Sequence, residues 1–137
     1  MDNVKKIQPR DIYPNINVLK GKTIISISVD GEDSVNILTG DGNEYSIYHS
    51  QSCCESVAID SVTGDIEKMI GEEIVEAHED SQPYEKASQS GTETIYTLKT
   101  KNNSLIIHWI GESNGYYSET PIFVHNLMPE NQETRGF

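Results

Sequence analysis

The sequence predicts a mostly β protein of the α+β class, with a largely antiparallel meander of seven or eight strands and one short helix. Two observations support this class. Apolar and polar residues alternate with a period of two in several segments, as with Ile25, Ile27 and Val29 in TIISISV. Turns rich in Gly, Asn and Asp separate these segments. The 137 residues fit one domain with a single core.

The first half of the domain is predicted to form three strands joined by tight turns, followed by a fourth strand. The alternating segment at 23–29 is the first strand, and SVNILT at 34–39 is the second. GDGN at 40–43 supplies a turn before EYSIYH at 44–49, whose β-branched and aromatic residues favour a third strand. The apolar run SVAI at 56–59 is expected to be the fourth.

The predicted helix lies in TGDIEKMIGEE and is about two turns long. Asp65 suits the N-cap, and Gly71 suits the C-terminal stop. Ile66, Met69 and Ile70 have the i, i+3 and i+4 spacing of one apolar face. We therefore expect this short helix to pack on the sheet through those three side chains.

The second half of the domain returns to strand patterns. EIVEAHE at 73–79 is a predicted strand, and the polar residues 80–91 are a predicted loop. TETIYTLKT at 92–100 and SLIIHWIGE at 104–112 are two strong strand segments joined by the turn KNNS.

The chain is expected to close with a turn, a strand and a tail. Asn114 and Gly115 fit a tight turn with positive φ at both central residues. ETPIFVH then supplies the last strand. The predicted organisation is an extended basic arm over residues 1–20, one β-rich domain over 21–126 and a flexible tail over 127–137.

The charge of the chain limits its partners. Its 22 acidic and ten basic residues give a net charge of −12. This charge argues against direct binding of nucleic acid or of an anionic membrane, and it favours a partner with a basic surface. The sequence has no apolar run of membrane length and no signal peptide pattern, so we expect the host cell cytoplasm as its location. A homo-oligomer is compatible with the sequence.

The stretch YHSQSCCESVAID at 48–60 offers three interpretations. His49, Cys53 and Cys54 are zinc-ligand types, which His78, His108 or His125 could complete, but adjacent cysteines on extended chain point to opposite faces. A cysteine nucleophile activated by His49 and oriented by Glu55 is the second interpretation. It requires a tight loop, because four extended residues span about 13 Å.

The third interpretation is structural, and we favour it. Here one cysteine is a small buried hydrophobic residue, while His49, Gln51 and Glu55 satisfy backbone groups where the sheet bends. Adjacent cysteines cannot staple distant parts of the chain, so we expect reduced thiols. No bound metal is predicted.

Three motifs together resemble a family of small uncharacterised proteins of bacteriophages and prophages. They are H-x-Q-x-C-C-E-S-V from His49 to Val57, G-D-I-x-x-x-I-G from Gly64 to Gly71, and S-N-G-Y-Y-S-E from Ser113 to Glu119. The resemblance covers roughly residues 21–125. It implies a phage origin and a compact β-rich fold, and it brings no reaction with it.

Two surfaces are candidates for contact with a partner. The stretch from Asp60 to Glu93 holds ten acidic residues against two lysines, and such an array could imitate nucleic acid charge. We assign the partner-binding acidic face to Glu67, Glu72, Glu73, Glu76, Glu79 and Asp80. The second candidate is an aromatic contact around the turn, formed by Trp109, Tyr116 and Tyr117, although alternate members of this set could fill the core.

These patterns favour binding over catalysis. The sequence contains no ATP-binding glycine loop, triad order, paired-histidine metal motif or dinucleotide fingerprint, and no cofactor is expected. Our leading hypothesis is a phage or prophage counter-defence protein that blocks a nucleic-acid-handling host immune component through its acidic surface.

Two alternatives remain for the function. One is a protein that sequesters a small signalling nucleotide between subunits, and the other is a phage accessory protein without an immune target. Sequestration requires cations to meet the phosphate groups. The folded body offers few cations, which are Lys68, Lys86, Lys99 and Lys101, and the N-terminal arm could contribute Lys5, Lys6 and Arg10.

Overall fold

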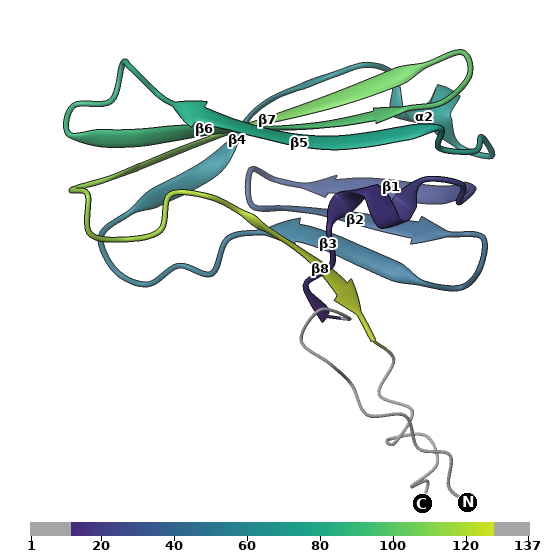
Figure 1. Ribbon diagram of the computed structural model, residues 1–137, viewed down its shortest axis with the longest axis horizontal. Coiled ribbons are helices and arrows are strands. Elements are labelled where there is room, and N and C mark those ends of the chain that lie inside the picture. Colours follow the sequence, from purple (N-terminus) through teal and green to yellow (C-terminus); the bar gives the residue numbers. More distant parts are fainter. Residues whose placement is uncertain (1–11, 128–137) are drawn as a thin grey trace, which may run out of the picture.

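The computed structural model describes residues 12–127, which form two four-stranded antiparallel sheets stacked as two layers (Figure 1). The first sheet has the strand order β1-β2-β3-β8, and the second has the order β4-β7-β6-β5. The predicted class, mostly β with antiparallel pairing and a short helix, is confirmed. The elements are η1 (Ile16–Leu19), β1 (Ile24–Asp30), β2 (Ser34–Thr39), β3 (Glu44–Tyr48), β4 (Ser56–Thr63), α2 (Ile66–Met69), β5 (Glu76–Pro83), β6 (Ser90–Lys99), β7 (Ser104–Ser113) and β8 (Ile122–Asn126).

The chain crosses between the two sheets twice. Residues 49–55 lead from β3 in the first sheet to β4 in the second, and residues 114–121 lead from β7 back to β8. Each crossing brings a strand beside a partner far away in sequence, as in the pairs Ile47 with Phe123 and Ile59 with Trp109. The single meander expected from the sequence is therefore divided into two layers by these crossings.

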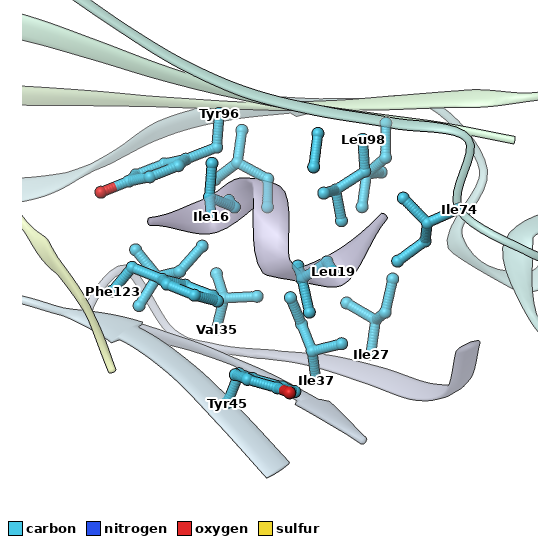
Figure 2. Packing of buried hydrophobic residues seen from close by; sticks show 14 of the residues in the cluster. Ile16, Leu19, Ile27, Val35, Ile37, Tyr45, Ile74, Tyr96, Leu98 and Phe123 are labelled. Atoms are coloured by element: carbon cyan, nitrogen blue, oxygen red, sulfur yellow. The ribbon is translucent and has the colours of Figure 1, made fainter. Parts of the chain in front are cut away.

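The core fills the space between the layers. Alternate residues of the strands point inward because side chains in a strand alternate between the two faces. Figure 2 shows Tyr96 and Leu98 of the second sheet on one side and Val35 and Ile37 of the first sheet on the other. The helix η1 lies between them, so it adds side chains to the core that the two sheets enclose.

The helix η1 falls within the segment predicted to be an extended arm, residues 1–20. Its Ile16 and Leu19 are buried in the core, which explains why the chain folds here. Asn15 caps the helix by accepting a hydrogen bond from the amide of Asn17 at 2.9 Å. Residues 1–11 of the arm lie outside the described residues, as do residues 128–137 of the predicted tail.

The predicted helix appears as α2, with Asp65 as its N-cap. The Asp65 side chain accepts from the amide of Glu67 at 3.0 Å, and Gly71 follows with φ +87°. The prediction that Ile70 shares the buried face is wrong. Ile70 is already extended and is 41% exposed, because the helix is a single turn that ends at Met69, and Met69 is fully buried.

The predicted loop at 80–91 begins too early. Asp80 to Pro83 continue β5 and pair with β6 as far as Pro83 opposite Thr92. These residues lack apolar alternation because β5 is an edge strand with mostly exposed side chains, and Pro83 is tolerated at its end.

None of the helices in the described part of the chain has the length and apolar character needed to cross a bilayer.

Candidate functional site

Two of the six predicted acidic site residues lie together on the outer side of the second sheet. Glu76 and Asp80 share the outward side of β5, since Ala77 between them points into the core. Glu79 has the parity of Ala77 and lies opposite Tyr96. Burial of its carboxyl group, followed by the nearby Asp80, raises the pKa of Glu79.

The other three predicted acidic residues lie outside this sheet face. Glu67 is exposed on α2, and Glu73 is exposed beside the start of the first sheet, where it bridges to Thr23. Glu72 accepts hydrogen bonds from Asn103 Nδ2 at 3.0 Å and from the hydroxyl of Thr100. These bonds, the one from Asn103 foremost, lower the pKa of Glu72, so this carboxylate anchors the β6–β7 turn.

The outward side of the second sheet also carries acidic residues that our assignment missed, among them Asp60 and Glu93. Glu93 on β6 and Asp60 on β4 flank His108 of β7. His108 Nε2 lies 2.9 Å from Glu93 Oε1, and His108 Nδ1 lies 3.6 Å from Asp60 Oδ2. A β-bulge between Ile59 and Ser61 places Asp60 beside this histidine. We define the acidic face as Asp60, Glu76, Asp80, Glu93 and His108.

A groove of about 680 Å³ opens at one end of the acidic face. Its lining combines carboxylates with an aromatic ring and apolar surface, through Asp60, Tyr84, Glu85, Glu93 and Ile110. The half-buried Ile95 and Ile106 continue the apolar surface along the same side of the sheet. Carboxylates beside apolar surface suit a lysine or arginine side chain, because such a side chain has an apolar stem and a cationic head.

The three predicted aromatic contacts lie in different environments. Trp109 is fully buried and packs in the core, whereas Tyr116 is 82% exposed. Tyr117 is half-buried and meets Tyr116 edge to face, with ring centroids 5.3 Å apart. The exposed aromatic surface at this turn is therefore formed by the two tyrosines.

The turn before these tyrosines differs from the prediction of positive φ at both Asn114 and Gly115. Of the two, only Gly115 has positive φ, at +95°. The Asn114 side chain instead accepts from the amide of Tyr116 at 3.0 Å. The reason is topological, since this segment does not close a hairpin and instead begins the crossing from β7 to β8.

The cysteine stretch forms the other crossing, at residues 49–55. Cys53 and Cys54 are joined in a disulfide, and both are exposed. The expectations of reduced thiols and of one buried cysteine are therefore wrong. The buried residue is Glu55, whose side chain is fully enclosed. Burial of a carboxylate requires partners, and the loop supplies them.

Glu55 is the centre of this loop. Its carboxylate accepts from the amides of Ser52 at 2.8 Å and Cys53 at 3.0 Å, and from His49 Nε2 at 2.7 Å. Gln51 Nε2 donates to the backbone oxygen of Glu55 at 2.6 Å. The prediction that His49, Gln51 and Glu55 satisfy backbone groups is thus confirmed, although the segment crosses between two sheets and is not a bend within one sheet.

His49 ties this loop to the second crossing. Its Nδ1 lies 3.1 Å from the backbone oxygen of Thr120, which belongs to residues 114–121. The ring thus lies between the Glu55 carboxylate on one side and a backbone oxygen on the other. We call the contacts among His49, Ser52, Cys53, Glu55 and Thr120 the junction, because they join the two segments that cross between the sheets.

The junction has a clear electrostatic signature. The Cys53 amide first, then the Ser52 amide and His49, lower the pKa of Glu55 from 4.5 to about 2. Because the folded pKa lies below the ordinary value, this carboxylate contributes stability that is present above about pH 4.5 and is lost as the pH falls toward 2.

The zinc and nucleophile interpretations do not match these contacts. Both sulfur atoms are committed to the disulfide, and His49 Nε2 is bonded to Glu55. Within residues 12–127, no group of three or more His, Cys, Asp or Glu side chains is arranged to hold a metal ion.

The family model described as Domain of unknown function (DUF7448) matches residues 17–123. The chain belongs to that family. The match begins within η1 and ends in β8, so the DUF7448 domain includes both sheets, the acidic face and the junction. No curated protein and no solved structure matches the chain.

Proposed function

We propose that this protein binds a basic partner through its acidic face and blocks that partner's own contacts with nucleic acid. In this proposal the partner is a host immune component, and the setting is phage counter-defence. The observation that supports binding is the gathering of carboxylates from β4, β5 and β6 on one side of a single sheet, next to the groove. The resemblance to phage proteins supports the setting.

The sheet gives these carboxylates a regular spacing. Neighbouring strands lie about 4.8 Å apart, and residues i and i+2 on one side lie about 6.8 Å apart. Carboxylates on three strands therefore form a two-dimensional array of negative charge. A basic groove that normally holds a phosphate backbone would meet a comparable array here, which is the physical basis for competition.

Capture of a signalling nucleotide fits the acidic face less well. Lys86 lines the groove together with Asp60, Glu85 and Glu93. Lys99 lies 3.9 Å from Glu76 at the surface. Each lysine is thus close to carboxylates, which would repel the phosphates of a nucleotide.

The test compares two variants with the same change in net charge. Glu76→Lys with Asp80→Lys reverses two exposed charges of the acidic face. Glu32→Lys with Asp33→Lys reverses two exposed charges in the β1–β2 turn. Each protein is used to capture partners from a bacterial host lysate, and the affinity for the captured partner is then measured. We expect the face variant to lose affinity by on the order of 10- to 100-fold, and the turn variant to bind like the parent.

Salt and competition complete the test. The association rate with the parent should fall as salt rises, because the Debye length is about 10 Å at 0.1 M. Duplex DNA should compete with the protein for the partner. Equal binding by the face variant and the parent would contradict the proposal, and so would a captured partner that is acidic. Co-purification of a nucleotide would favour sequestration instead.

A further inference from the structure

The disulfide lies in the first crossing between the sheets, in the same loop as His49, which contacts the second crossing through the backbone oxygen of Thr120. We propose that Cys53 and Cys54 form a reversible thiol–disulfide site, and that its reduction by an external dithiol loosens the junction. The disulfide itself provides the chemistry, and the junction contacts provide the structural consequence. The site is separate from the acidic face, so the proposal is independent of the proposed function.

Access to the disulfide differs from access to the side chains of His49 and Glu55. Cys53 and Cys54 are both exposed, whereas the side chains of His49 and Glu55 are only 6% and 0% exposed. A soluble dithiol can therefore reach the sulfur atoms without displacing the buried contact between His49 and Glu55. Attack on a disulfide requires an approaching thiolate, which exposure permits.

The reaction balances without any other component. A thiolate of the dithiol attacks one sulfur, the Cys53–Cys54 bond breaks, and a mixed disulfide forms. The second thiol of the dithiol then closes its own disulfide and releases the second cysteine. Two electrons and two protons pass from the dithiol to the cysteines, which become thiols.

Cys53 connects this chemistry to Glu55. A bond between the side chains of adjacent residues closes a small ring that restricts the backbone of both residues. The ring includes the peptide group between the two cysteines, so it limits ψ of Cys53 and φ of Cys54. These torsions lie between the Cys53 amide and Glu55, and that amide donates to Glu55 Oε1 at 3.0 Å. The amide of Ser52 donates to Oε2 of the same carboxylate at 2.8 Å. Opening the ring restores rotational freedom at Cys53. The gain in conformational entropy opposes the hydrogen bond from the Cys53 amide to Glu55.

Loosening should pass from Glu55 to the second crossing. Glu55 Oε2 lies 2.7 Å from His49 Nε2, and His49 Nδ1 lies 3.1 Å from the backbone oxygen of Thr120. The chain of contacts is thus Cys53 to Glu55 to His49 to Thr120. The strands on either side have their own ladders, so the sheets should remain intact after reduction.

The experiment uses the full chain equilibrated with oxidised or reduced dithiothreitol. Intact mass after treatment with a maleimide counts free thiols, and hydrogen exchange reports the amides of Ser52 and Cys53. We expect no adduct in the oxidised protein and two in the reduced protein. Reduction should speed exchange of the two amides by on the order of tenfold, with no change at Tyr96 and Ile107 in the core strands.

A second readout follows the Glu55 carboxyl group by NMR titration. Loss of the Cys53 hydrogen bond should raise the pKa of Glu55 from about 2 toward its ordinary value. The double variant Cys53→Ser with Cys54→Ser is the matched control. It should resemble the reduced protein in both readouts and should not respond to dithiothreitol.

Three outcomes would overturn the proposal. Two free thiols in the presence of oxidised dithiothreitol would show that the disulfide does not form. Equal exchange at Ser52 and Cys53 in both redox states would show that the junction does not respond. Loss of protection at Tyr96 and Ile107 on reduction would show that the disulfide supports the whole fold rather than the junction.

Discussion

The outer faces of the two sheets arrange their polar side chains in different ways. On the first sheet, Asn126 donates to Ser46 at 2.7 Å, Ser46 donates to Asn36 at 2.6 Å, and Asn36 donates to Asp30 at 2.9 Å. This polar chain crosses β8, β3, β2 and β1 in spatial order. On the second sheet, the acidic face places carboxylates around His108, with half-buried isoleucines beside them.

The two outer faces differ in the charge that they present to solvent. The polar chain is built largely from neutral groups that satisfy one another across the strands, so it presents little net charge to a partner. The acidic face gathers negative charge at the surface next to a groove. Like charges held together cost stability, and a basic partner relieves that cost. The outer side of the first sheet therefore contributes hydrogen bonds to the fold, and in our proposal the outer side of the second sheet is the one that contacts a partner.

The largest effect should come from the core that supports both faces. Trp109 is fully buried on the inner side of β7. Its neighbours in sequence, His108 and Ile110, lie on the outward side of the second sheet. Trp109→Ala should lower the free energy of unfolding by about 3–5 kcal/mol, because it leaves a large cavity. Chemical denaturation measures this loss.

Trp109→Phe is the matched control for that change. It keeps most of the ring volume and removes a buried Nε1–H group that has no hydrogen-bond partner among the described residues. It should therefore cost clearly less than Trp109→Ala. If alanine costs no more than phenylalanine, the two faces do not depend on packing at Trp109.

A smaller effect should follow from breaking the polar chain of the first sheet. Ser46 is buried, and it both accepts from Asn126 and donates to Asn36. Ser46→Ala removes both bonds and should cost about 1–3 kcal/mol in unfolding free energy. Ser28→Ala, at an exposed position on β1, should stay within about 0.5 kcal/mol. Similar costs for the two variants would contradict the stabilising role of the polar chain.

The smallest effect on stability should come from the acidic face. Glu93→Gln keeps the shape of the side chain and removes the charge beside His108. Because this pair is partly exposed, the change should alter unfolding free energy by no more than about 1 kcal/mol. Partner binding should weaken more than stability does. A loss of unfolding free energy as large as that of Ser46→Ala would contradict the prediction that the acidic face contributes less to stability than the polar chain.

The strands could be predicted from sequence because their side chains alternate. Leu105, Ile107 and Trp109 alternate with more polar or less buried neighbours, and the structure buries all three. The end of β5 could not be predicted, since Asp80 to Pro83 lie on an edge strand where both sides are exposed. The helix η1 was missed because a single 3-10 turn has too few residues to show a period.

The candidate sites show a similar division. The roles of His49, Gln51 and Glu55 were predictable because they are local, within one loop. The acidic face depends on strand order, which brings Asp60 and Glu93 beside His108 from three separate strands. Local sequence does not contain that order. Parity alone does separate Glu79 from Glu76 and Asp80, so this part of the face was within reach of sequence reasoning.

The pairing of β3 with β8 has a consequence for how the protein is made. In this pairing Tyr45 lies opposite His125. The first sheet is therefore completed by β8, which is synthesised only after all four strands of the second sheet. Until then β3 has an open edge, which carries the apolar Tyr45 and Ile47. An open strand edge in a nascent chain is a site for mispairing with other chains. Pairing of the last described strand, β8, therefore covers the open edge of β3. A pause in translation before residue 122 would prolong the time during which this edge can mispair with other chains.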